Sequence, residues 1–166
     1  AIGEAFDKVA RVVGLGYPGG PKVDRLALQG EPNIELPKTH FDNLDFSFSG
    51  IKTAVINLHH KNPDINKADL CASFEKTVTE ILIEHIKKAI EITGLKTVAL
   101  AGGVSANSYI RNAFDDLEKN AIKVYMPDLK LCTDNGAMIG SAGYYNYMAG
   151  IRDGLELNAI PNLKLN

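Results

Sequence analysis

The sequence predicts an α/β fold in which short strands alternate with helices in packed layers. The main observation lies in the second half, where apolar runs at 96–101 and 122–126 are each followed by a loop and a helical pattern, at 106–119 and 135–149. A second observation is the helical period of apolar residues over 68–93. Helices of this length between short strands are typical of α/β proteins.

The chain opens with two predicted helices. Apolar residues at helical spacing over 5–13 predict the first, and the glycines of 14–16 can take the left-handed conformation that ends it. Tyr17–Pro21, with two prolines and two glycines, predicts a rigid turn. A short second helix over 23–27 should stop at Gly30.

The next segment mixes irregular chain with short ordered pieces. Residues 31–45 are polar and contain prolines, so we expect irregular chain, with a short strand possible at 34–36. Apolar and polar residues alternate over 46–49, which predicts a half-buried strand that Gly50 breaks. A helical period then returns over 51–60.

A long amphipathic helix is predicted over 68–93. Asn66 or Asp64 could cap its start, and Gly94 should end it. Its apolar face is predicted to be Leu70, Phe74, Val78, Ile81, Leu82, His85 and Ala89.

Composition limits the class of protein. A chain of 166 residues that is 45% apolar is long enough for one well-packed core. The formal net charge of −2 gives no sign of nucleic-acid binding, so such a partner would need a local patch or another domain. Cys71 and Cys132 have no paired spacing, which favours reduced thiols in a cytosolic protein over a disulfide framework or a zinc site.

The sequence also bears on targeting. No apolar run approaches the roughly 18–20 residues that a membrane span needs, and no basic segment followed by an apolar one marks a signal peptide. The chain begins at Ala1, without an initiator Met and already in a helical pattern. We therefore expect a fragment of a longer protein.

The stretch Gly102-Gly103-Val104-Ser105-Ala106-Asn107 is the most informative motif. It follows the apolar run of 97–101 and precedes a helix. Glycine lets the backbone come close to a ligand, and a helix N-terminus offers free N–H groups to anions. A second strand–loop–helix passage at 132–138 strengthens the indication of a nucleotide site.

Taken singly, the other candidate residues have ordinary explanations. Asp134 precedes a helix, where it either caps that helix or faces a ligand or metal. Asp7 and Asp24 could be surface acids, Gly20 could serve only the turn, and Asn107 could be a polar residue of a first helical turn. No Walker loop, nucleophile elbow or His-Glu-x-x-His helix is found, so no complete catalytic set is visible.

Five motifs together resemble one family. They are Gly3-Glu4-Ala5-Phe6-Asp7-Lys8-Val9-Ala10, Tyr17-Pro18-Gly19-Gly20-Pro21, Phe46-Ser47-Phe48-Ser49-Gly50-Ile51-Lys52-Thr53-Ala54, Gly102-Gly103-Val104-Ser105-Ala106-Asn107 and Cys132-Thr133-Asp134-Asn135-Gly136-Ala137-Met138. Their order and spacing resemble the TsaD/Gcp family of tRNA N6-adenosine threonylcarbamoyltransferases, formerly labelled O-sialoglycoprotein endopeptidases, in its bacterial form.

The resemblance implies a fold and an activity. The fold is that of the actin-like ATPase and sugar-kinase (ASKHA) superfamily, and residues 1–166 would be its single C-terminal lobe, helix-rich with a small mixed sheet. The activity is transfer of the threonylcarbamoyl group from threonylcarbamoyl-AMP to the N6 amine of the adenosine beside the tRNA anticodon.

The resemblance also implies roles for single residues. Asp7 and Asp24 would meet the ribose or nearby polar groups, Gly20 would let the backbone approach the nucleotide, and Asn107 would contact the adenosine. Asp134 would be the carboxylate ligand of one iron or zinc ion. No residue of this chain is expected to be the catalytic acid, base or nucleophile.

The remaining expectations concern the absent half and the partners. The two metal-binding histidines of the family, spaced i and i+4, would lie in the missing N-terminal lobe, so the fragment alone should be inactive and metal-poor. Expected partners are tRNA and the proteins TsaB and TsaE, in the cytoplasm and away from membranes. The alternatives are a nucleotide-binding scaffold lobe or an ASKHA-type kinase, and a metallopeptidase is disfavoured because His-Glu-x-x-His is missing.

Overall fold

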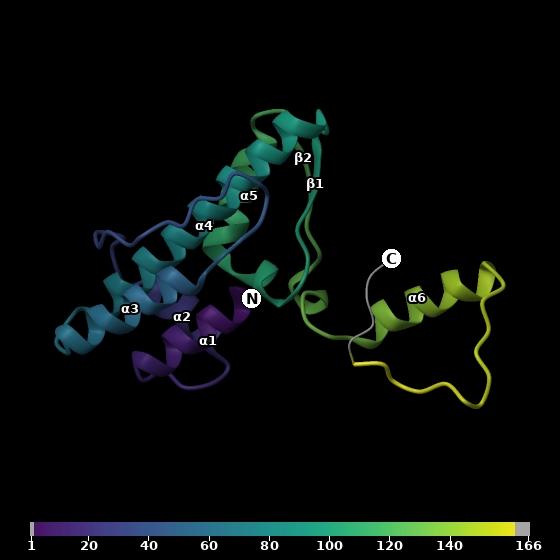
Figure 1. Ribbon diagram of the computed structural model, residues 1–166, viewed down its shortest axis with the longest axis horizontal. Helices are drawn as coiled ribbons and strands as arrows, with labels where there is room; N and C mark the ends of the chain where they lie inside the picture. Colours follow the sequence, from purple (N-terminus) through teal and green to yellow (C-terminus); the bar gives the residue numbers. More distant parts are fainter. Residues whose placement is uncertain (1, 162–166) are drawn as a thin grey trace. The chain divides into compact units, whose positions relative to one another are not determined.

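A computed structural model describes residues 2–161 of the chain (Figure 1). The described residues form two compact units, 2–132 and 133–161. In chain order the elements are α1 (Ile2–Val12), α2 (Gly19–Ala27), α3 (Ser49–Lys61), α4 (Lys67–Thr93), β1 (Thr97–Ala99), the 3₁₀ helix η1 (Gly103–Ala106), α5 (Ser108–Glu118), β2 (Lys123–Tyr125), the 3₁₀ helix η2 (Leu129–Leu131) and α6 (Gly136–Met148).

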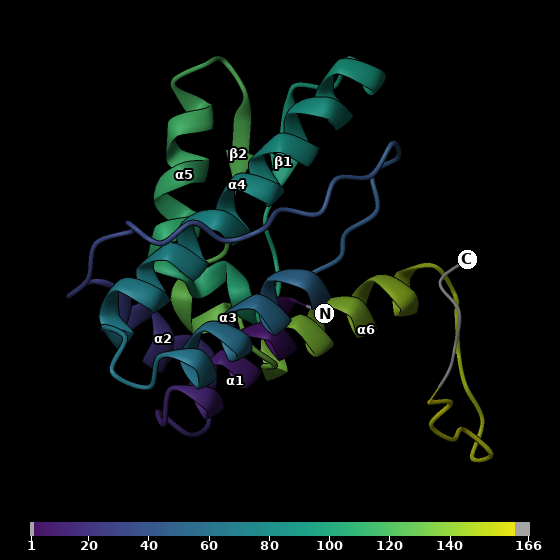
Figure 2. The same ribbon diagram turned by 60° about the vertical axis from the view of Figure 1, so that its left-hand side comes forward.

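The larger unit is built around α4. Helices α1 and α2 pack on each other, α2 and α3 contact α4, and α5 lies along the second half of α4 (Figure 2). The rings of Phe6 and Phe74 meet edge to face, with centroids 5.0 Å apart, inside the first core cluster. Such pairs contribute about 0.5–1.5 kcal/mol beyond the area they bury.

A small parallel sheet adds the β layer. Thr97, Val98 and Ala99 of β1 pair with Lys123, Val124 and Tyr125 of β2. A second core cluster, centred on Ile110, Phe114, Leu117 and Val124, packs α5 against the sheet and the C-terminal part of α4. The α/β prediction is therefore confirmed, although the sheet of the described residues is purely parallel and not mixed.

The long-helix prediction holds closely. Asn66 caps α4 by accepting hydrogen bonds from the backbone N–H groups of Ala68 and Asp69. Gly94, with φ of 70°, ends the helix in the left-handed conformation that glycine adopts without strain. The face predicted to be apolar is buried at Leu70, Phe74, Val78, Ile81 and His85, and half-buried at Leu82 and Ala89.

Two strand predictions are wrong. Residues 34–36 and 46–48 have no regular structure, and Ser49 and Gly50 are the first residues of α3. A strand needs a neighbour for its backbone groups, whereas here the ring of Phe46 stacks on the imidazole of His85, with centroids 4.5 Å apart. The alternation over 46–49 therefore reflects aromatic packing on α4.

The glycine turn and the helix at 106–119 also differ from expectation. Helix α2 starts at Gly19, inside the predicted turn, directly after a cis Tyr17–Pro18 bond. The helix predicted over 106–119 is α5, which begins at Ser108 because Asn107 is extended, with φ of −64° and ψ of 129°, and Ala106 belongs to η1.

The smaller unit contains α6 and the segment after it. Asn135 caps α6 by accepting a hydrogen bond from the Met138 N–H at 3.0 Å. At its other end the Arg152 guanidinium lies 3.8 Å from the centroid of the Tyr147 ring. Among residues 2–161, no helix combines the length and the apolar character required to span a membrane.

Candidate functional site

Asp7 binds the beginning of the next helix. Its Oδ1 accepts a hydrogen bond of 2.8 Å from the N–H of Gly19, the first residue of α2. The residue before it, Pro18, makes no side-chain cap. A carboxylate from α1 therefore caps α2, where the free N–H groups and the helix dipole favour negative charge.

The two adjacent glycines of α2 differ in their surroundings. A Cβ on Gly19 would lie 2.5 Å from Asp7 Cα and 2.8 Å from the carbonyl oxygen of Phe6, so packing of α1 on α2 excludes a side chain there. A Cβ on Gly20 would meet nothing within 4 Å. The fold thus explains Gly19, while the space beside Gly20 is open to a ligand.

Asp24, like Asp7, accepts hydrogen bonds at the start of a neighbouring helix, here α5. Its two carboxylate oxygens accept hydrogen bonds from the backbone N–H of Ser108 at 3.1 Å and from the Ser108 hydroxyl at 2.5 Å. Ser108 is the first residue of α5. Because Gly20 and Asp24 are four residues apart on α2, they lie on one face of that helix.

Asn107 is the N-cap of α5 and is 7% exposed. Its Oδ1 accepts from the N–H of Ile110 at 2.9 Å, and its Nδ2 donates to Oε1 of Glu75 on α4 at 2.6 Å. The structure therefore brings Asp24 and Asn107 together at the N-terminus of α5.

Glu75 and Ser108 belong to this cluster and were missed in the sequence. Glu75 is 2% exposed, and burial, followed by a smaller effect of the Asp24 charge, raises its pKa to about 7, although the Asn107 hydrogen bond lowers it. The available signal was an acid on a buried face of a helix, since Glu75 follows Cys71 by four residues and precedes Val78 by three. Ser108 had no signal beyond its place in a first turn.

The backbone conformation of Gly102, the first residue of the glycine pair, requires glycine. Gly102 has φ of 88° and ψ of 172°, a region open essentially to glycine alone. The Ser105 hydroxyl donates to the Gly102 carbonyl at 2.6 Å. The Arg111 guanidinium holds the loops after both strands by donating to the carbonyl oxygens of Ser105 and Pro127, at 2.9 and 3.1 Å.

Asp134 belongs to the smaller unit and is exposed. The cap of α6 is its neighbour Asn135, so capping does not explain Asp134. Within residues 2–161 no three His, Cys, Asp or Glu side chains gather closely enough to hold a metal ion. A transition metal expects several nitrogen or oxygen ligands, and one carboxylate does not fit that requirement.

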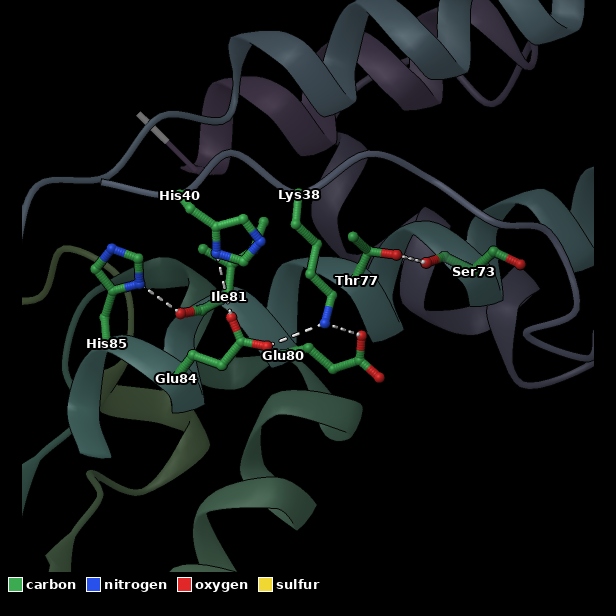
Figure 3. Close-up of polar contacts among 8 residues, drawn as sticks. All are labelled: Lys38, His40, Ser73, Thr77, Glu80, Ile81, Glu84 and His85. Carbon is green, nitrogen blue, oxygen red and sulfur yellow. Dashed lines mark hydrogen bonds and ion pairs between the residues drawn. The ribbon is translucent and has the colours of Figure 1, made fainter. Parts of the chain in front are cut away.

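A cavity of about 520 Å³ lies elsewhere, between the extended segment 32–40 and α4. Figure 3 shows Lys38 reaching from this segment to α4, where its Nζ lies 3.0 Å from carboxylate oxygens of both Glu80 and Glu84. The lining of this cavity includes none of the five predicted site residues. Exposed ion pairs of this kind contribute about 0–1 kcal/mol, and the cluster around α5 offers the more specific chemistry.

Comparison with known proteins agrees with the resemblance. Residues 1–141 match the family model of TsaD, tRNA N6-adenosine threonylcarbamoyltransferase. Curated proteins of that name from Clostridium novyi (strain NT) and Clostridium kluyveri (strain ATCC 8527) are 52% and 51% identical over 99% of this chain. One from Clostridium perfringens (strain SM101) is 53% identical over the same share. The chain spans about half (51%) of the length of these relatives.

Proposed function

The chain belongs to the tRNA N6-adenosine threonylcarbamoyltransferase family, and from this premise we propose that it forms the nucleotide-binding part of such an enzyme. We further propose that residues 1–166 are the C-terminal lobe of an ASKHA-type fold. The whole protein would then move the threonylcarbamoyl group from threonylcarbamoyl-AMP to the N6 amine of the adenosine beside a tRNA anticodon.

The observation that carries the proposal is the junction of α1, α2 and α5. Asp7, Gly20, Asp24 and Asn107 lie at or next to the N-termini of α2 and α5, linked through Gly19 and Ser108. Carboxylates such as those of Asp7 and Asp24 accept hydrogen bonds from ribose hydroxyls. The open space beside Gly20 lets a nucleotide approach the backbone.

In the proposed reaction the adenosine amine is the nucleophile, so no nucleophilic side chain is required. Nitrogen N6 attacks the carbonyl carbon of the threonylcarbamoyl group and loses a proton, while the bond from that carbon to the AMP phosphate oxygen breaks. AMP leaves and the new carbon–nitrogen bond remains on the tRNA. The contribution of this chain is to bind and orient the adenylate.

We also propose the remaining expectations for the whole protein. Asp134 would supply one carboxylate to an iron or zinc ion whose histidine ligands lie in the other half. TsaB and TsaE would be protein partners, and the enzyme would act in the cytoplasm. No step above depends on the ion.

The test uses the full-length protein with threonylcarbamoyl-AMP and tRNA. We expect modified adenosine in digested tRNA by mass spectrometry, and a loss of about tenfold or more in AMP affinity for Asn107→Ala. Lys38→Ala, at the separate cavity, is the control and should bind AMP normally. AMP binding without tRNA modification would identify a scaffold, and ATP-dependent phosphorylation would identify a kinase.

A further inference from the structure

The side-chain amide of Asn107 has two ends that do different things. Its Oδ1 caps α5 through the Ile110 N–H, and its Nδ2 donates to Glu75 Oε1 at 2.6 Å. If the amide turned over, Oδ1 would face the Glu75 oxygen and the cap would lose its acceptor. Glu75 thus determines which atoms of Asn107 remain for a ligand.

The surroundings of Glu75 explain why its charge matters. It is 2% exposed on α4. The titratable groups around Glu75 are Asp24 on α2, Cys71 on α4 and Tyr109 on α5. The Asp24 charge helps to raise the pKa of Glu75, and the Glu75 charge in turn helps to raise the pKa values of Cys71 and Tyr109. Burial, and secondarily Asp24, raise the pKa of Glu75 to about 7. Near neutral pH the group therefore changes between an ionised acceptor and a weaker neutral one.

We propose that Glu75 is a positioning residue of the nucleotide site, acting through the orientation of the Asn107 amide and the N-terminus of α5. The proposal rests on the function proposed above. Glu75 itself touches no substrate. Its effect is on binding of the adenosine part, so KM should change and kcat should not.

The experiment measures kcat and KM for threonylcarbamoyl-AMP with the full-length protein between pH 6 and 8.5. For Glu75→Ala we expect KM to rise about tenfold at pH 8, with kcat within about twofold, because Asn107 is released. Glu75→Gln keeps a carbonyl acceptor, so its KM should stay within about threefold of the wild type.

The pH profile distinguishes positioning from a merely structural role. The wild-type KM should rise about threefold to fivefold from pH 8 to pH 6, as Glu75 takes up a proton and the charge-assisted bond is lost. Glu75→Gln should show no such rise. Glu84→Gln removes a charge from the same helix about 14 Å away and should follow the wild type.

A spectroscopic arm is independent of turnover. The NMR shift of the Asn107 side-chain NH₂ should titrate near pH 7 in the wild type and in Glu84→Gln, and not in Glu75→Gln. An unchanged pH dependence in Glu75→Gln, or a Glu75→Ala variant that loses kcat while KM stays the same, overturns the inference. If Glu75→Ala does not fold, the Glu75→Gln profile alone decides. A wild type that forms no modified nucleoside contradicts the proposed function, and the NMR titration still tests Glu75.

Discussion

The adjacent glycines of α2 give a sharp prediction, because one serves the fold and the other faces open space. Gly19→Ala places a Cβ 2.5 Å from Asp7 Cα and 2.8 Å from the Phe6 carbonyl, which are backbone atoms that cannot move aside alone. Gly20→Ala places a Cβ that meets nothing within 4 Å. The two variants add the same methyl group at neighbouring positions.

The magnitudes follow from these contacts. Overpacking costs about 1–3 kcal/mol, and Gly19→Ala should be near the upper end because α1 must shift away and the Asp7 hydrogen bond weakens. Gly20→Ala should be neutral or stabilising by about 0.4–1 kcal/mol, because alanine restricts the unfolded chain and favours the helix. Its methyl group would instead meet the nucleotide, at a cost of about tenfold or more in Kd.

The assay is urea denaturation of the full-length protein, combined with AMP binding by calorimetry. We expect a lower midpoint for Gly19→Ala, and an unchanged or higher midpoint with weakened binding for Gly20→Ala. The reasoning is refuted if Gly20→Ala binds AMP as the wild type does, or if Gly19→Ala is as stable as Gly20→Ala.

Three further predictions concern stability and reactivity. The pKa of Glu75 is raised from 4.5 to about 7 in the folded state, so the folded protein holds this proton more tightly than the unfolded chain does. The free energy of unfolding should therefore fall by up to about 3 kcal/mol as the pH rises from 4.5 to 7. Denaturation of Glu75→Gln should lack this fall, and an equal fall in that variant would contradict the pKa assigned to Glu75. Burial, and secondly the Glu75 charge, raises the pKa of the Cys71 thiol to about 12. Iodoacetamide at pH 8.5 should therefore label Cys71 only after unfolding, with the labelled site located by mass spectrometry. Rapid labelling of Cys71 in the folded protein would contradict the raised pKa. Asn66→Ala removes the cap of α4 and should lower the free energy of unfolding, measured by denaturation, by about 1 kcal/mol. Asn66→Asp keeps a capping oxygen and should lower it little. Equal losses in the two variants would contradict the capping role.

The sequence predicted the helices well where period and caps agree. Apolar spacing, Asn66 and Gly94 together defined α4 almost to the residue. The strand at 46–49 failed because alternation does not reveal whether a partner strand exists, and Phe46 packs on His85 instead. The periodicity of one sequence indicates which side of a segment is apolar, but it does not identify the element that packs against that side.

The candidate site was predicted through the resemblance, and its geometry was not. Asp7, Asp24 and Asn107 were expected to face a ligand, yet each also holds a helix N-terminus. Such bonds join residues as far apart in sequence as Asp24 and Ser108, so no local pattern could indicate them. Glu75 had a local signal, as an acid on a buried helix face, but its partner Asn107 lies 32 positions away, so no local pattern indicated the contact between them.

The carboxylate of Asp24 has a consequence for how tightly a nucleotide binds. Both oxygens already accept hydrogen bonds from Ser108. A ribose hydroxyl that binds there has to share these oxygens or displace the serine hydroxyl, so one hydrogen bond is exchanged for another and the net gain is small. Because Ser108 keeps the carboxylate paired whether or not a ligand brings a hydroxyl, Asp24 should discriminate only weakly between ligands with and without that hydroxyl.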